Sequence, residues 1–67
     1  DGMDAVRAIV HDAPRFLRHG GVLVVEIGHN RDLAEAAFPR LPFVWLATHS
    51  SQDSVFLVTR EDLIAGR

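Results

Sequence analysis

The sequence contains no cysteine, no lysine, no tyrosine and no long hydrophobic run. Without cysteine, disulfide bridges and cysteine-ligated zinc sites are excluded, and the composition fits a cytoplasmic location. No apolar stretch approaches the ~18 residues that a transmembrane helix needs, and no signal-peptide pattern is visible. The formal net charge is −2, which argues against a protein whose main role is to bind phosphate backbones. We therefore expect a cytoplasmic protein that does not enter membranes.

The chain has the composition of an ordinary globular protein but little length in which to build a core. Hydrophobic residues make up 48% of it and charged residues 24%. A chain of 67 residues forms one domain at most, and chains of this size bury only ~60% of their unfolded surface. The sequence also opens inside a helical pattern, without a leading strand. We therefore expect residues 1–67 to be a fragment of a larger domain.

The first segment has the period of an amphipathic helix. Apolar side chains recur at intervals of three and four residues, at Val6, Ile9, Val10, Ala13, Phe16 and Leu17. Pro14 interrupts this helix, which predicts either a kink or a second short helix with Asp12 as its N-cap. Gly20 should end the helical run as the left-handed C′ residue.

The next segment reads as a strand followed by a short helix. Residues 22–27 are apolar at every position except Glu26, which predicts a strand that is covered on both faces in the whole protein. Gly28 should end this strand. Asn30 is then placed to cap a helix over residues 32–38.

The last part of the chain reads as two more strands and a turn of helix. The loop of residues 49–54 between strands 43–48 and 55–59 is too short for a crossover, so these strands must be antiparallel. Strand 55–59 is continuously apolar and should therefore lie inside the sheet, between the other two. Thr59 with Asp62 resembles a capping box for a final helical turn.

The predicted connections leave one face of this sheet without cover. Right-handed crossovers place both earlier helices on the same face, although the strands are apolar on both. The missing part of a larger domain, or a second copy of the chain, must cover the other face.

Four pieces of this sequence, in this order and spacing, resemble the C-terminal third of the HemK/PrmB family of protein glutamine methyltransferases. The pieces are Asp-Gly-Met-Asp at residues 1–4, Gly-Gly-Val-Leu-Val-Val-Glu-Ile-Gly at 20–28, Phe-Val-Trp-Leu at 43–46, and Val-Phe-Leu-Val-Thr-Arg-Glu-Asp-Leu at 55–63. The chain is most similar to the branch that modifies a large-subunit ribosomal protein. The resemblance covers essentially the whole chain.

The resemblance implies an α/β fold, the C-terminal part of a class I (Rossmann-like) methyltransferase sheet with an antiparallel final strand. It implies S-adenosylmethionine as cofactor of the whole enzyme, a ribosomal protein as its partner, and methyl transfer to a glutamine side-chain nitrogen. The family's glycine-rich loop and Asn-Pro-Pro-Tyr motif lie upstream of the matched region, and in this sequence Asn30 precedes Arg31. We therefore assign no catalytic and no cofactor-binding residue to this chain. The family's glycine-containing turn before the last strand is replaced here by residues 50–54.

Three residues near the end of the first strand are substrate-side candidates: Glu26, His29 and Asn30. Glu26 either faces the substrate cleft or is a sheet-end carboxylate held by loop amides or an arginine. His29 and His49 follow two parallel strands, but an intervening strand would separate their backbones by ~9–10 Å. We predict no metal site and two ordinary loop histidines.

Other conspicuous residues have structural explanations. Trp45 should fill a core or an interface, with a stacking platform as the alternative. The acidic residues at positions 1 and 4, with Gly2 between them, either cap the first helix or line the cleft of the whole enzyme. The basic side chains of residues 15–19 suit a solvated helix end.

Two functions from other classes stay open. The chain could be a small non-catalytic α/β interaction module that dimerises through its bare sheet face. It could also belong to a class I methyltransferase that acts on a nucleic acid or a small molecule, because a fold does not fix a function.

Overall fold

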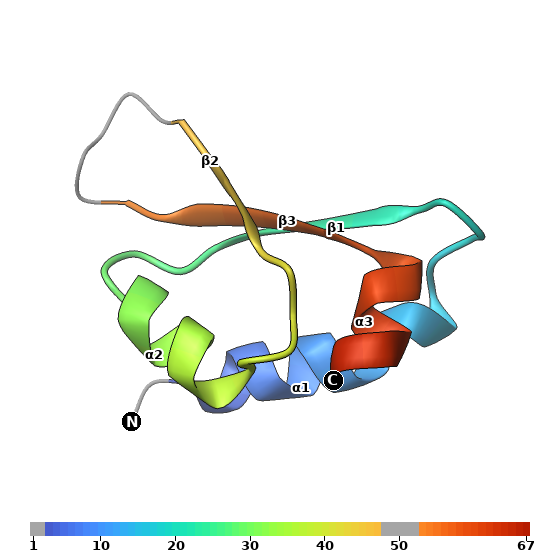
Figure 1. Cartoon of the computed structure of the whole chain (residues 1–67), viewed down its shortest axis with the longest axis horizontal. Coiled ribbons are helices and arrows are strands. Elements are labelled where there is room, and N and C mark those ends of the chain that lie inside the picture. The colour runs from blue at the N-terminus through green and yellow to red at the C-terminus, as the bar shows by residue number, and fades with distance from the viewer. Residues whose placement is uncertain (1–2, 48–52) are drawn as a thin grey trace.

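The computed structural model describes residues 3–47 and 53–67, which form a three-stranded sheet backed by helices (Figure 1). The order of elements agrees with the predicted order of helix, strand, helix, strand and strand. The elements are α1 (Asp4–Asp12), a 3-10 turn η1 (Ala13–Arg15), β1 (Val22–Glu26), α2 (Arg31–Ala37), β2 (Val44–Leu46), β3 (Val55–Thr59) and α3 (Arg60–Gly66).

Strand β3 occupies the centre of the sheet, and the strand order is β1-β3-β2. It runs antiparallel to both neighbours, so β1 and β2 point in the same direction. One cross-strand row joins Val24, Leu57 and Val44. The predicted interior position of residues 55–59 is therefore confirmed. Strand β2 is shorter than predicted, and Thr48 lies outside the described residues.

All the helices lie on one side of the sheet, which confirms the predicted placement of the first two (Figure 1). The core forms between this helical layer and the sheet. Phe56 and Val58 of β3 are 0% and 1% exposed, and Met3, Val10 and Leu63 on the helical side are fully buried.

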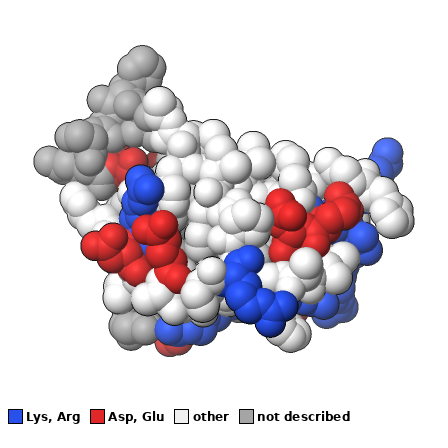
Figure 2. Space-filling view, viewed as in Figure 1, with Lys and Arg blue, Asp and Glu red and all other residues white. Residues whose placement is uncertain are grey.

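None of the described residues covers the opposite face of the sheet. Its valines on the outer strands are about half exposed: Val22 is 47%, Val24 52% and Val44 53% exposed. Figure 2 shows uncharged surface along the upper side of the molecule, where the sheet lies. The predicted bare apolar face is thus present, and we use this name below for the side of the sheet away from the helices.

The first helix differs from its predicted apolar stripe. Met3 belongs to the core, while Ile9 is 38% and Phe16 78% exposed. Phe16 is exposed because α1 ends at Asp12 and the chain continues as a 3-10 turn around the buried Pro14. A 3-10 turn has a different period from an α-helix, so Phe16 rotates away from the core. Of the two alternatives at Pro14, the second short helix is the one that forms.

Several predicted caps differ from the observed ones. Asp12 occupies the N-cap of η1, but its side chain makes no capping bond there and lies 3.2 Å from the His11 ring nitrogen Nδ1. Gly20 is left-handed, with φ +76°, but it belongs to the turn before β1 and lies beyond the helix end. Asp4 pairs with Arg7 at 3.3 Å. The residues before Met3, predicted as caps, lie outside the described residues.

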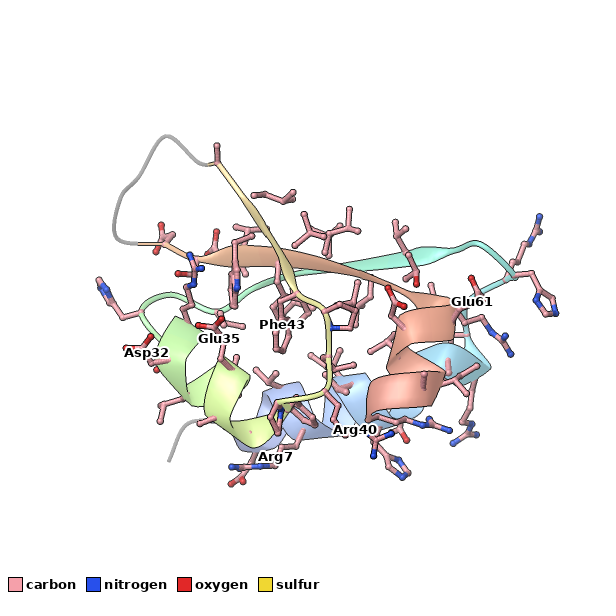
Figure 3. All side chains as sticks on the ribbon, in the orientation of Figure 1. Arg7, Asp32, Glu35, Arg40, Phe43 and Glu61 are labelled. Atoms are coloured by element: carbon pink, nitrogen blue, oxygen red, sulfur yellow. The ribbon has the colours of Figure 1, made fainter. Side chains whose placement is uncertain are left out.

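The last helix is fixed at both ends by side-chain contacts. The predicted cap at its start is present, because the Asp62 backbone N–H donates to Thr59 Oγ1 at 3.1 Å. Glu61 accepts a hydrogen bond from the Gly20 backbone N–H at 3.0 Å, and Arg40 donates to the Ala65 carbonyl oxygen at 2.6 Å (Figure 3). These contacts hold α3 against segments distant in sequence.

Candidate functional site

The substrate-side candidates lie at the sheet edge where the parallel strands β1 and β2 both end. Gly28 makes the turn out of β1 in a left-handed conformation, with φ +58°. Two hydrogen bonds continue the strand pairing past β1: Ile27 N–H donates to the Ser54 carbonyl at 2.9 Å, and Ser54 N–H donates to the Gly28 carbonyl at 2.8 Å. The turn that carries His29 and Asn30 is therefore anchored to the strand that follows residues 48–52.

Glu26 lies on the bare face of the sheet. Its cross-strand neighbours are Val55 and, beyond it, Leu46. The side chain is exposed, and none of the described residues forms a hydrogen bond or an ion pair with its carboxylate. The anchoring by loop amides or an arginine that we considered is thus absent from the described part of the chain.

His29 and Asn30 begin the connection from β1 to α2. His29 is exposed, whereas Asn30 is half-buried. Asn30 occupies the N-cap of α2, as predicted, but its side chain makes no capping bond there. Its backbone N–H closes the turn by donating to the Ile27 carbonyl oxygen at 3.1 Å. The Asn30 side-chain amide therefore has no part in holding the helix start.

The described residues offer no recognisable metal centre. Among residues 3–47 and 53–67, no group of three or more histidine, cysteine, aspartate or glutamate side chains could hold a metal ion. His49 lies outside these residues, so the alternative of a site shared with His29 is not tested. Within the described part of the chain, no helix is both long and apolar enough to cross a membrane.

The structure also has a hollow of about 360 Å³ beside α2, which the sequence did not predict. The Arg31 guanidinium lies 4.7 Å from the Trp45 ring centroid and forms an ion pair with Glu35 at 3.5 Å. The Trp45 ring packs against Phe43 and Phe56 at centroid distances of 5.3 and 5.9 Å. Trp45 thus fills the helix-covered side, as predicted. The spacing of four between Arg31 and Glu35 was the available signal for this pair.

Comparison with known proteins finds relatives along nearly the whole chain. It is 58% identical over 64 residues to the ribosomal protein uL3 glutamine methyltransferase of Neisseria gonorrhoeae, a match that covers 96% of this chain and 21% of that protein. The proteins of the same name from Bordetella pertussis and Bradyrhizobium diazoefficiens are 59% and 48% identical over 63 residues, covering 94% of this chain and 21% and 20% of their own lengths.

The chain therefore spans about a fifth of the length of the curated relatives it matches. No family model matches it, and no solved structure does. The resemblance to ribosomal protein glutamine methyltransferases is confirmed by these relatives, which are 48% to 59% identical to it.

Proposed function

We propose that residues 1–67 are the C-terminal part of the catalytic domain of an S-adenosylmethionine-dependent methyltransferase. Its substrate would be a glutamine side-chain nitrogen of ribosomal protein uL3. The observation that carries this proposal is the 58% identity over 96% of the chain to a protein named for that reaction. The antiparallel strand inside the sheet supports it, because the same topology was expected from the family resemblance.

In this proposal the segment supports the enzyme and carries no chemistry itself. The described residues do not fit S-adenosylmethionine, because their left-handed glycines, Gly20 and Gly28, stand singly in separate turns. No glycine lines the hollow beside α2. A glycine-rich turn that lets the backbone approach the ligand is the usual feature of such nucleotide-type sites. The cofactor would therefore bind to the part of the enzyme outside this chain.

The role proposed for this segment is to form a wall on the substrate side. Open α/β sheets bind ligands outside the carboxyl ends of their parallel strands, and β1 ends at Glu26. His29 and Asn30 follow it, and their side chains form no hydrogen bond or ion pair with the described residues. The ribosomal protein would be the partner, and the cytoplasm the place of reaction.

The test uses the full-length protein with S-adenosylmethionine and purified uL3. We expect one methyl group on one uL3 glutamine, detected by mass spectrometry of peptides, and no transfer when that glutamine is replaced by alanine. His29→Ala and Asn30→Ala should raise KM for uL3 several-fold without lowering the melting temperature. The matched control is His11→Ala, an exposed histidine on α1 away from the candidate edge. Unmodified uL3 would contradict the proposal.

The isolated 67-residue chain should not bind the cofactor. Isothermal titration with S-adenosylmethionine should show no saturable heat up to millimolar concentration, since the glycine-rich loop is missing. The full-length protein is the positive control. A micromolar dissociation constant for the isolated chain would mean that we have assigned the cofactor to the wrong part of the enzyme.

The bare face favours a second candidate, a non-catalytic module that dimerises. That function predicts a stable dimer of the isolated chain and no methyl transfer by the full-length protein. A methyltransferase with another substrate would instead bind S-adenosylmethionine and leave uL3 unmodified.

A further inference from the structure

The Arg31 guanidinium is held from two directions beside α2. One of its faces lies over the Trp45 ring, with the guanidinium carbon 4.7 Å from the ring centroid, and its Nε is 3.5 Å from Glu35 Oε1. Trp45 is itself supported by the buried ring of Phe56, at a centroid distance of 5.9 Å. An aromatic face and a carboxylate together orient the plane of an arginine side chain. Arg31 is therefore oriented without a ligand.

The remaining polar atoms of this pair are open to a ligand. A guanidinium carries five N–H donors in one plane, and none of the described residues accepts a hydrogen bond from the two terminal nitrogens of Arg31. Glu35 forms no ion pair or hydrogen bond with any other described residue. The two side chains are 52% and 48% exposed, and both line the hollow of about 360 Å³. Figure 3 shows Glu35 on the same side of the sheet as Phe43, which also lines the hollow.

The charges around the hollow favour a neutral ligand. Arg31 is accompanied on α2 by two carboxylates, those of Asp32 and Glu35. An anion that approached Arg31 would also approach Glu35, and a cation that approached Glu35 would also approach Arg31, so repulsion offsets attraction in both cases. An amide group suits both residues, because its carbonyl oxygen accepts from Arg31 and its N–H donates to Glu35. The pair therefore fits an amide better than an ion of either sign.

The hollow adjoins the candidate substrate edge. Arg31 directly follows Asn30, and α2 lies in the connection between the parallel strands that end at this edge. A volume of about 360 Å³ is near the lower limit of small-ligand sites, so it suits one residue of an extended chain. A substrate segment that passes the end of β1 can thus reach this hollow.

We propose that Arg31 and Glu35 form a specificity subsite that binds one amide group in the uL3 segment flanking the methylated glutamine. The amide belongs either to an asparagine or glutamine side chain or to the backbone of that segment. This inference rests on the proposed function and adds the two residues that recognise the neighbouring part of the substrate. Trp45 is a positioning residue, because it orients the Arg31 guanidinium.

Steady-state methylation of uL3 by the full-length protein tests the subsite. Arg31→Lys keeps the charge but loses the planar fork, so it should raise KM for uL3 about tenfold or more and leave kcat within about twofold. The dissociation constant of uL3, measured by titration with S-adenosylhomocysteine present, should rise by a similar factor. The matched control is Arg7→Lys, because Arg7 forms an exposed ion pair with Asp4 at 3.3 Å on α1. An unchanged KM and dissociation constant for Arg31→Lys would overturn the proposal.

Substitutions in the substrate identify the source of the amide. Each asparagine and glutamine that flanks the methylated glutamine is replaced in turn by alanine. A side chain bound in the subsite is one whose replacement raises KM for the unsubstituted enzyme but not for Arg31→Lys. If no side chain behaves in this way, a synthetic uL3 peptide with an ester in place of each flanking backbone amide is tested by the same criterion. The proposal is overturned if neither series couples to Arg31.

Glu35→Gln tests the preference for a neutral group. Where the amide belongs to a side chain, an aspartate in its place should raise KM for the unsubstituted enzyme about tenfold, and less for Glu35→Gln, which lacks the repelling charge. A lower KM with aspartate would identify a subsite for anions and overturn the proposal. If the unsubstituted enzyme leaves uL3 unmodified, the proposed function itself fails. If uL3 is methylated and Arg31→Lys has no effect, only the subsite fails.

Discussion

The two faces of the sheet are built from the same kinds of residue but meet different surroundings. On β3, Phe56 and Val58 point to the helices and are 0% and 1% exposed. On the other face, the neighbours of Leu57 across the sheet are Val24 and Val44, which are 52% and 53% exposed. Apolar composition thus predicts that a face is to be covered, but the connections decide which face this chain covers itself.

The connections explain the asymmetry. Helix α2 lies in the crossover between the parallel strands β1 and β2, and such crossovers have a fixed hand. Helix α1 enters β1 from the same side, and α3 folds back to that side after β3 (Figure 1). No described segment is left to cover the other face. The described chain therefore covers one face of its sheet and leaves the other bare, in keeping with the proposal that it belongs to a longer protein.

Shortening a buried side chain on the covered side of the sheet should have the largest effect on stability. In the isolated chain, Phe56→Ala should cost about 3–5 kcal/mol, because the fully buried ring leaves a cavity beneath the sheet. That is comparable to a total stability of about 3–10 kcal/mol expected for a chain of this length. Urea titration followed by circular dichroism should find the variant largely unfolded.

The neighbouring position on the bare face is the matched control. Leu57→Ala in the isolated chain should cost only about 1–2 kcal/mol, because less of its surface leaves water on folding. In the longer protein the same change should cost about 2–5 kcal/mol, if the face is covered there. If Leu57→Ala lowered stability equally in the isolated chain and in the longer protein, the expected difference between the two faces would be contradicted.

Self-association of the isolated chain is the next largest effect. Its bare face should bring copies together, so sedimentation across a dilution series should show concentration-dependent species. Val24→Asp should weaken this association by roughly tenfold or more, since it would bury a charge without a partner. Ile64→Asp alters an apolar side chain of similar exposure on α3 and should leave association unchanged. A monodisperse unsubstituted chain would contradict the prediction.

The sheet was predictable from sequence because its signals are local and few alternatives compete. The short link of residues 49–54 dictates an antiparallel pair, and four apolar residues in a row place β3 inside. The Thr59 side chain and the Asp62 backbone N–H, which form the cap of α3, are three residues apart. In each case the residues that decide the outcome are close together in the chain.

What sequence reasoning missed depends on contacts between distant segments. Phe16 continued the helical period, yet the 3-10 turn at Pro14 turned it outward, to 78% exposure. One of the bonds that anchor α3, from Arg60 Nε to the Pro14 carbonyl oxygen at 3.2 Å, joins residues 46 positions apart. At the candidate edge, the positions of Glu26, His29 and Asn30 followed from the predicted strand end. The missing side-chain capping bond of Asn30 could not be predicted, because asparagine is a preferred N-cap residue.

The smallest expected effect concerns the starts of two helices on the covered side. Thr59 Oγ1 accepts the Asp62 backbone N–H at 3.1 Å, so Thr59→Ala should cost about 1 kcal/mol of stability through loss of a cap. Asn30 occupies the same position in α2 without a side-chain cap bond, so Asn30→Ala should be close to neutral. Urea denaturation of the longer protein would measure both, with Thr59→Ser as the variant that keeps the cap. If Asn30→Ala cost as much as Thr59→Ala, its side chain would have to cap α2 in solution. Asn30 would then have a structural role in the fold and would no longer be a candidate for contact with the substrate.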